Sequence, residues 1–430
     1  MIGRLQSGGM TNPAVGTAPV ITPQTHTHHH RPSGRSAGAH SWGFWVAAVA
    51  FLLNMGFSAV PTPLYAIYAV RDGLDSVTIT LIYAVYAIGV IVSLFFGGHV
   101  SDWIGRKAVF VPALLLNVVS AVIFILRPSF GGLIVARIVS GVSVGLTTAT
   151  ATAYLSELHL GARPGAPGRR AQIIATAANL GGIGVGPLIA GILAQYAPAP
   201  LQLPYLVFAI AIAVLAILVA VSPETALIPS PVPRYRPQRI AVPRSTRGTF
   251  FAATGAGIAA FAVFGVFNSL VPSFLVTMHE TSHAFAGAVA FATFAAGAAA
   301  QIVLARWDTR AMLRRSIPIL IVGLALFSIG MWIPNIVVFL IGGIITGAGG
   351  GLLFRAAMVT AAGAAAPEAR AEVLAGFFLG AYIGLSVPVI GLGVATLYWP
   401  AVNVMLVFVV LVLAAVITTV LILTRRSRKA

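Results

Sequence analysis

Apolar runs of about twenty residues fill most of this sequence and constrain its fold more than any other feature. A helix needs ~20 apolar residues to cross the hydrocarbon core of a bilayer, and a chain in hydrocarbon must satisfy its backbone hydrogen bonds internally. Twelve such runs occur, near residues 43–69, 79–99, 108–126, 131–156, 171–196, 203–222, 249–277, 284–305, 316–333, 335–365, 373–396 and 400–424. The sequence therefore predicts an all-α integral membrane protein with twelve transmembrane helices.

The segments between the runs divide the chain into two halves of six helices. The longest segment, 223–248, carries six prolines and five arginines, a composition typical of an extended linker. We expect a disordered cytoplasmic tail over 1–41, a first bundle over 42–222, a second bundle over 249–424 and a basic tail over 425–430. Glycines and prolines recur in similar order in both bundles, which predicts the pseudo-symmetric repeat found in many transporters.

Charged residues are few and unevenly placed. They make up 8% of the chain, too little for a soluble globular enzyme. If the N-terminus is cytoplasmic, Arg71 and Arg127 are the only basic residues in the outer loops, as the positive-inside rule requires. We therefore expect both termini in the cytoplasm and a multi-pass protein of the cytoplasmic membrane.

The distribution of residue types also limits the partners. Basic residues cluster between apolar runs rather than along one face, so no nucleic-acid partner is expected despite the net charge of +17. The chain has no cysteine, and neither Lys107 nor Lys429 lies in a P-loop pattern. The histidines within 25–30 could bind a metal ion, but no carboxylate or thiol lies beside them, so we expect a disordered tail and no metal site. We expect a monomer that works with the bilayer, a small molecule and protons, without a cofactor.

The loop after the second run combines glycines with charged residues over 98–110. Gly98 would allow neighbouring helices to pack closely, and Gly105 supplies a backbone turn that other residues resist. Arg106 and Lys107 open the next helix, where the helix dipole disfavours positive charge. Either membrane topology or pairing with a nearby acid must therefore favour them.

This loop resembles the signature loop of the major facilitator superfamily, which has a glycine, an acid, and then a glycine followed by two basic residues. The matching residues are Gly98, Asp102, Gly105, Arg106 and Lys107. Trp103 departs from the pattern. The resemblance implies a cytoplasmic latch that stabilises one conformation, with that role carried by Asp102 and Arg106. From the residues alone, Asp102 and Glu157 are the candidate acids for pairing. A degenerate copy over 306–315 keeps Asp308 and the basic residues but lacks the glycines. Membrane topology alone accounts for the basic residues of this copy.

The fourth run carries Arg137, Gly141 and Gly145 in the spacing RxxxGxxxG. The two glycines form a groove for close helix contact. A charge at hydrocarbon depth is costly unless it faces protein or water, so Arg137 is a functional candidate, with snorkelling to the outer surface as the alternative. The spacing resembles the fourth-span motif of the superfamily, whose arginine is linked to proton handling.

The fifth run contains a glycine and proline pattern that indicates the direction of transport. It resembles the motif GxxxGPxxGG associated with antiporters and drug exporters of the superfamily. The matching residues are Gly182, Gly186, Pro187 and Gly191, with Ala190 as a mild departure. The alternative is close helix packing with no directional meaning. A similar pattern surrounds Pro388 in the eleventh run.

None of the nine acids is predicted at mid-membrane. Because proton coupling usually uses a buried carboxylate, coupling here would run through Arg137 with solvent or substrate, or through rim groups such as Glu157 and His99. A cation would meet no counter-charge, so the expected cargo is a neutral or weakly anionic amphipath with Arg137 or Arg355 as the positive pole. The alternative for Arg355 is snorkelling at the cytoplasmic end.

Four further residues are candidates to line the pathway, because spans 1, 4, 7 and 10 do so in the superfamily. They are Asn54, Asn268, Tyr65 and Phe267. The amides serve either helix–helix hydrogen bonding or ligand contact, since an unpaired amide in hydrocarbon is costly. The aromatic rings would stack on a flat ligand, although packing is the alternative for Phe267.

Together these features predict a secondary active transporter that exports small amphipathic compounds or drugs in exchange for protons. Proton-coupled uptake of a metabolite is the alternative. An intramembrane enzyme is a remote third possibility, because it would need a base, a nucleophile or a metal set at membrane depth. We therefore expect no enzymatic activity.

Overall fold

The computed structural model describes residues 36–226, 242, 244–365 and 370–426. Within them, twelve helices are long and apolar enough to cross a membrane, and no strand occurs. The predicted all-α, twelve-span architecture is therefore confirmed. Most of the expected N-terminal tail, the middle of the linker and the last four residues lie outside the described part of the chain.

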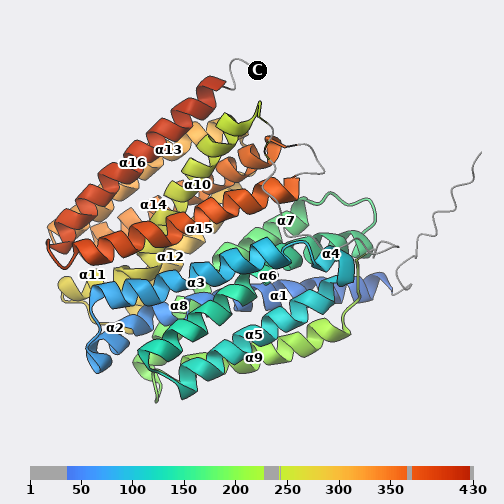
Figure 1. Cartoon of the computed structure of the whole chain (residues 1–430), viewed down its shortest axis with the longest axis horizontal. Helices are drawn as coiled ribbons and strands as arrows, with labels where there is room; N and C mark the ends of the chain where they lie inside the picture. The colour runs from blue at the N-terminus through green and yellow to red at the C-terminus, as the bar shows by residue number, and fades with distance from the viewer. Residues whose placement is uncertain (1–35, 227–241, 243, 366–369, 427–430) are drawn as a thin grey trace, which may run out of the picture. The chain divides into compact units, whose positions relative to one another are not determined.

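The first half contains six spans, two of them built from more than one helix (Figure 1). Its helices are α1 (Ala37–Ala59), α2 (Pro61–Asp72), α3 (Ser76–Gly97), α4 (Ser101–Ile104), α5 (Arg106–Leu126), α6 (Phe130–Ala162), α7 (Arg169–Thr176), the π-helical turn η1 (Ala177–Gly181), α8 (Gly182–Tyr196) and α9 (Leu203–Val221). Helix α1 begins before the predicted bundle boundary at residue 42, because the Ser36 side chain accepts a hydrogen bond from the Ala39 amide and caps it.

The second half repeats the plan. Its helices are α10 (Arg247–Ser269), α11 (Val271–Thr277), α12 (His283–Val303), α13 (Thr309–Trp332), α14 (Ile336–Gly363), α15 (Arg370–Ala395) and α16 (Ala401–Arg426). The first span of each half is broken at one residue, Val60 between α1 and α2 and Leu270 between α10 and α11. A proline follows each break, and its missing N–H group explains why the helix is interrupted there.

Polar side chains cap several spans at their N-termini. Asp75 accepts a hydrogen bond from the Thr78 amide at 2.8 Å, and this bonding holds the pKa of the Asp75 carboxyl below its ordinary value. Ser282 caps α12 in the same way through the Phe285 amide. The second span of each half thus begins with a capped turn.

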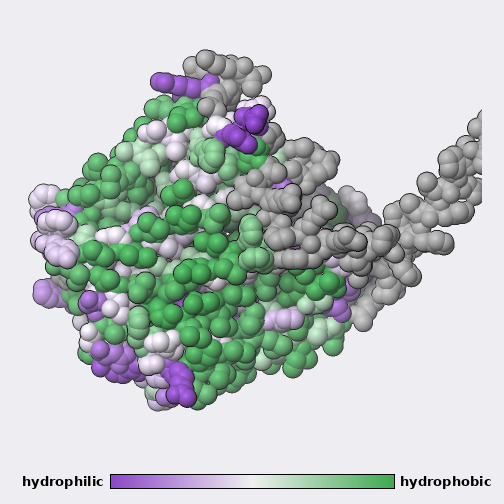
Figure 2. Space-filling view, in the orientation of Figure 1, coloured by the Kyte–Doolittle hydropathy of each residue, from purple (hydrophilic) through white to green (hydrophobic). Residues whose placement is uncertain are grey.

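The two halves meet through α8 with α12 and α3 with α15. Glycines permit this approach: a Cβ atom on Gly191 would overlap the His283 carbonyl, and one on Gly287 would overlap the Pro187 carbonyl. Figure 2 shows apolar residues over most of the visible flank, with hydrophilic residues gathered at the end that carries α2 and α11. The exposed apolar flank is the surface that a membrane protein presents to lipid.

Candidate functional site

Arg137 on α6 is buried, with 1% of its surface exposed, so the snorkelling alternative is wrong for this conformation. Its guanidinium donates to the carbonyl oxygens of Ser58 at 2.5 Å and Tyr83 at 3.4 Å. The guanidinium also lies over the rings of Tyr83 and Tyr86, 5.5 and 4.9 Å from their centroids. Arg137 therefore links α1, α3 and α6 in one polar site.

The close packing of α3 on α6 produces this environment around Arg137. A Cβ atom on Gly141 would overlap the Tyr86 carbonyl, and one on Gly145 would overlap the Ser93 hydroxyl. The predicted glycine groove is therefore present, and it brings the two tyrosines of α3 against Arg137. Among the described residues, Arg137 forms no ion pair with a carboxylate. Within the described part of the chain, carbonyl dipoles and ring faces are the groups that balance this positive charge.

Asn54 lies one turn below Ser58 on α1 and is fully buried. It donates to the hydroxyls of Ser143 at 3.1 Å and Thr147 at 2.9 Å. The Asn117 amide donates in turn to the Asn54 side-chain oxygen at 2.8 Å. Of the two alternatives for Asn54, helix–helix hydrogen bonding describes this structure, because its amide joins α1, α5 and α6.

Asn268 also bonds between helices, but across the two halves. The Thr62 hydroxyl donates to the Asn268 side-chain oxygen at 2.7 Å and to its backbone carbonyl at 2.9 Å. Tyr65 lies one turn further along α2 and is 2% exposed. Its hydroxyl finds no hydrogen-bond partner among the described residues, so it is a polar group available to a ligand or water.

Two predicted site residues lie apart from this polar region. Phe267 is 1% exposed and packs against the ring of Phe327 at 4.8 Å, so it does not present a stacking face in this conformation. Arg355 is half-buried and donates to the Gln301 carbonyl within its own half. The structure therefore places Arg137, Asn54 and Tyr65 on α6, α1 and α2 of the first half and Asn268 on α10 of the second half, and it leaves Arg355 on α14.

The halves close against each other at the end that carries α2 and α11. The inter-half hydrogen bonds of the described residues join Thr62 to Asn268, Ser386 to the Ala84 carbonyl, and the His283 amide to Gln195. Toward the other end, an apolar hollow lies between parts of α3 and α15. Its lining residues are Ile91, Leu94, Phe95, Ala375 and Leu379. Arg137 lies just inside the closed end, about 10 Å along α6 from its first residue.

At the opposite end, Arg106 forms two ion pairs, with Asp102 at 2.5 Å and with Glu157 at 2.7 Å. Its side chain is 10% exposed, and the Ser101 hydroxyl accepts a further hydrogen bond. Gly105 has φ of +108°, and its position confirms the backbone turn that the sequence predicts. The pairing is in place, while its action as a latch stays a prediction.

Gly97, the residue before Gly98, contacts the neighbouring span at this loop. A Cβ atom on Gly97 would overlap the Leu146 side chain of α6. Gly98 has an ordinary helical φ of −58° and donates its amide to Leu94. Close packing is thus present at Gly97, and for Gly98 it stays a prediction.

Glu224, at the start of the linker, is the functional candidate that sequence reasoning missed. Its carboxylate accepts hydrogen bonds from the backbone amides of Arg106 at 2.9 Å and Lys107 at 3.1 Å. A carboxylate at a helix N-terminus is favoured by the helix dipole, and it offsets the basic residues that open α5. The Thr225 hydroxyl donates to Glu157 at 2.6 Å. The linker therefore begins inside the latch network.

The predicted motif of the fifth span lies on α8, where it contacts both halves. A Cβ atom on Gly182 or Gly186 would overlap carbonyl oxygens of α1, from Leu52 and Gly56. Gly191 lies against α12 of the other half, and Pro187 lies within the helix. The second such segment surrounds Pro388 within α15.

Comparisons with known proteins agree with this architecture. A model of the Major Facilitator Superfamily matches residues 46–279, which is more than half of the chain. The chain therefore belongs to the major facilitator superfamily and is a membrane transporter.

Two relatives match part of the sequence. An uncharacterised transporter of this type from Methanocaldococcus jannaschii is 30% identical over 151 residues, 35% of this chain and 37% of the relative. The quinolone resistance protein NorA of Staphylococcus aureus is 27% identical over 108 residues, 25% of this chain and 28% of NorA. The matched regions thus span about a third of these relatives or less.

Two solved structures share the fold over nearly their whole length. The nucleoside transporter NupG superposes with a TM-score of 0.69 at 12% identity, covering 89% of this chain and 99% of NupG. A bacterial homologue of the human lysosomal transporter Spinster, in an inward-facing conformation, gives 0.64 at 15% identity, covering 91% and 96%. At these identities the likeness shows the fold alone.

Proposed function

We propose that this chain exports small amphipathic compounds in exchange for protons by alternating access. The observation that carries the proposal is the contact of the Gly182–Gly191 segment with both α1 and α12. A glycine-rich helix that touches both halves is suited to a pivot, since small residues let backbones slide past each other. The partial similarity to the quinolone resistance protein supports drug-like cargo.

The cargo is proposed to be neutral or weakly anionic. Arg137 is buried with carbonyl and aromatic partners and without a carboxylate among the described residues. A cationic compound at this depth would be repelled by the guanidinium, whereas an anionic or strongly dipolar group would supply its missing counter-charge. The Tyr65 hydroxyl adds a neutral polar contact.

The proposed location is the cytoplasmic membrane with both termini in the cytoplasm. In that orientation the closed end with Thr62 and Asn268 faces outside, and the hollow between α3 and α15 faces the cytoplasm. An exporter takes up its cargo from the cytoplasmic side.

Transport into proteoliposomes with an imposed pH gradient tests the proposal. An acidic interior drives accumulation by proton antiport, whichever way the protein is inserted, whereas an acidic exterior drives accumulation by symport. We expect a fluorescent neutral amphipath to accumulate only with an acidic interior, and a protonophore to abolish the uptake. Accumulation driven only by an acidic exterior would establish metabolite symport instead, and uptake indifferent to the gradient would exclude proton coupling.

A further inference from the structure

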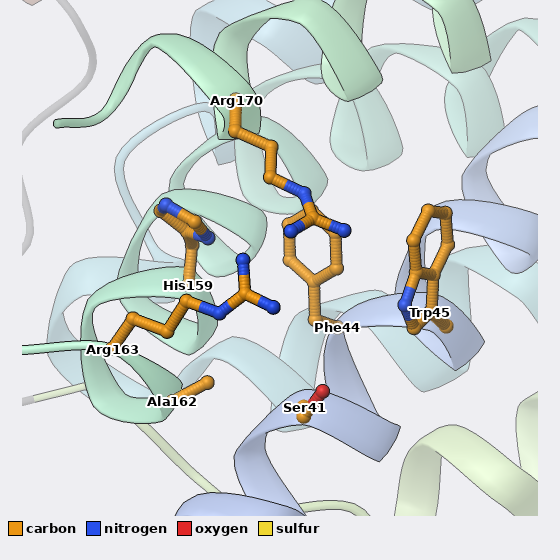
Figure 3. Close-up of a pocket in the computed structure, with 7 residues that line it drawn as sticks. All are labelled: Ser41, Phe44, Trp45, His159, Ala162, Arg163 and Arg170. Atoms are coloured by element: carbon orange, nitrogen blue, oxygen red, sulfur yellow. The ribbon is translucent and has the colours of Figure 1, made fainter. Parts of the chain in front are cut away.

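A basic hollow lies between the start of α1 and the end of α6, at the same end of the bundle as α4 and α7 (Figure 1). Seven residues line it: Ser41, Phe44, Trp45, His159, Ala162, Arg163 and Arg170. Figure 3 shows the guanidinium groups of Arg163 and Arg170 directed into the same space beside the Phe44 ring. No carboxylate is among the lining residues.

Two like charges that share one hollow repel each other, and an anion between them removes this repulsion. Arginine is also the side chain best suited to phosphate, because its planar group donates two parallel hydrogen bonds. Arg170 lies 5.8 Å from the Trp45 ring centroid, a contact that holds its guanidinium at the hollow. The charges therefore favour a phosphate group as occupant.

The buried histidine of this hollow is an independent indication of a ligand. His159 is 5% exposed, and its Nε2 atom has no hydrogen-bond partner among the described residues. The Phe44 ring packs beside it, with the two centroids 5.8 Å apart. A buried polar atom without a partner is costly unless a ligand or water completes it. A phosphate oxygen would accept a hydrogen bond from a proton on Nε2.

The surroundings point to a lipid as the source of that phosphate. Trp42 and Trp45 are 44% and 47% exposed on the first turns of a membrane-spanning helix, the position of the aromatic belt at a membrane surface. Basic pockets beside spans at this level are typical of anionic headgroup sites. The hollow itself is narrow, so a headgroup phosphate fits at its mouth while the acyl chains stay in the bilayer.

We propose that Arg163, Arg170 and His159 bind the phosphate of an anionic phospholipid in the leaflet at this end of the protein. The site lies apart from Arg137 and does not depend on the proposed cargo or its direction of transport. It would fix the end of α6 to the start of α1 and α7 when the lipid is present.

Binding of dioleoylphosphatidylglycerol to the full chain in detergent, followed by native mass spectrometry and thermal unfolding, tests the proposal. We expect one tightly held lipid and a raised melting temperature. Arg163→Gln with Arg170→Gln should weaken binding about 25-fold, because each arginine near a membrane surface contributes about a five-fold factor, which corresponds to ~1 kcal/mol. Arg127→Gln, which removes one exposed charge at the opposite end, serves as the control and should bind as native.

Three results would overturn the proposal. Equal binding of dioleoylphosphatidylcholine would show that headgroup charge is irrelevant. An equal melting-temperature rise with inorganic phosphate alone would indicate a free-anion site instead of a lipid site. Unchanged lipid binding in the double glutamine variant would place the lipid elsewhere. Conversely, partial retention in Arg163→Lys with Arg170→Lys and a loss in His159→Leu would support it.

Discussion

The connection between the second and third spans is stabilised by different contacts in the two halves. In the first half, Arg106 pairs with two acids, and Glu224 caps the helix that it opens. In the second half, Asp308 instead caps α13 through the Ala311 amide at 3.0 Å. The nearby Arg315 stacks on Trp307 at 4.1 Å and belongs to none of the ion pairs found among the described residues. The connection in the first half is held by a network of charged residues. In the second half it is held by a helix cap and by the contact of Arg315 with Trp307.

The interiors of the two halves differ in the same sense. The first half encloses Arg137 and the hydrogen-bonded cluster around Asn54. The second half is lined by phenylalanines, such as Phe327 between Phe267 and Phe339 at 4.8 and 4.4 Å. The repeat thus preserves helix breaks and close glycine contacts, while charge is concentrated in one half. We infer that the first half performs the polar steps of transport and the second supplies an apolar wall.

Substitution of Arg137 and of Arg355, one buried or half-buried arginine in each half, should test this difference most clearly. Arg137→Lys keeps the charge, but an ammonium group cannot bond two carbonyls and stack on two rings together. The loss of charged hydrogen bonds worth ~1.5–3 kcal/mol predicts a fall of transport by about 10- to 100-fold. Arg355→Lys, which retains one bond to a carbonyl, should stay within about three-fold of native transport.

Initial transport rates in proteoliposomes, normalised to the amount of folded protein, provide the measurement. Melting temperatures of both variants serve as the control for folding. If Arg355→Lys lost as much transport as Arg137→Lys, the assignment of the polar steps to the first half would be wrong.

Glycine substitutions should show what the halves share. A Cβ atom on Gly186 would overlap the Gly56 carbonyl in the first half, and one on Gly384 would overlap the Ile258 carbonyl in the second. Because overpacking a tight contact costs ~1–3 kcal/mol, each alanine variant should lower the melting temperature by several degrees. Gly131→Ala, with no atom within 4 Å of the added Cβ, is the matched control. A native-like Gly384→Ala would mean that only one half depends on close backbone contact.

Neutralising an acid in each connection should separate the latch from its degenerate copy. Glu157→Gln removes one carboxylate partner from the partly buried Arg106. A loss of ~1 kcal/mol would lower the population of the state described here, relative to the alternate conformation, about five-fold. Asp308→Asn should cause no shift, since asparagine caps a helix as well as aspartate. Because the chain has no cysteine, spin labels on Phe95→Cys and Leu379→Cys report the distance between α3 and α15 directly. Equal shifts in both variants would refute the distinction.

The sequence predicted the architecture well because twelve apolar runs leave few alternatives. The turn at Gly105 and the ion pairs of Arg106 could also be predicted from the sequence. Two basic residues at the start of a helix are disfavoured by its dipole, so acidic partners nearby were expected. Glu224 was missed because 117 or more residues separate it from the amides that it caps. The sequence signal for Glu224 was an acid directly after the sixth span. The bond from the neighbouring Thr225 to Glu157 is visible only in the structure.

The roles of the candidate amides and rings could not be read from the sequence. Asn54 and Phe267 occupy similar apolar runs, yet one joins three helices and the other packs against phenylalanines. The outcome depends on which side chains face them from helices far away in the sequence. Arg137 was recognised as exceptional because a charge in hydrocarbon is rare, but its tyrosine partners follow only from the packing of α3 on α6.

The smallest expected effect concerns the caps that open the second span of each half. The pKa of Asp75 is lower in the folded protein than its ordinary value of 3.8, chiefly because Thr78 donates hydrogen bonds to the carboxylate. The unfolded chain therefore takes up its proton first as the pH falls. The charge of the cap stabilises the fold above that ordinary value, and this part of its contribution disappears as the pH falls through the lower folded value, whereas a neutral carboxyl oxygen still accepts a hydrogen bond as a serine hydroxyl does. Ser282, which does not titrate, should cap α12 equally at all these pH values.

Melting temperatures of the native protein and Asp75→Ser between pH 6 and pH 2.5 would measure this contrast. The native protein should be slightly more stable at pH 6, by less than the ~1 kcal/mol of an ordinary cap, because the exposed Asp75 is screened by solvent. The gap between the two curves should narrow toward the acidic end, as the carboxyl takes up its proton. Ser282→Ala should instead lower the melting temperature by a constant amount. A constant gap for Asp75→Ser would show that the charge of the first cap contributes nothing, and the two halves would then be alike at this position.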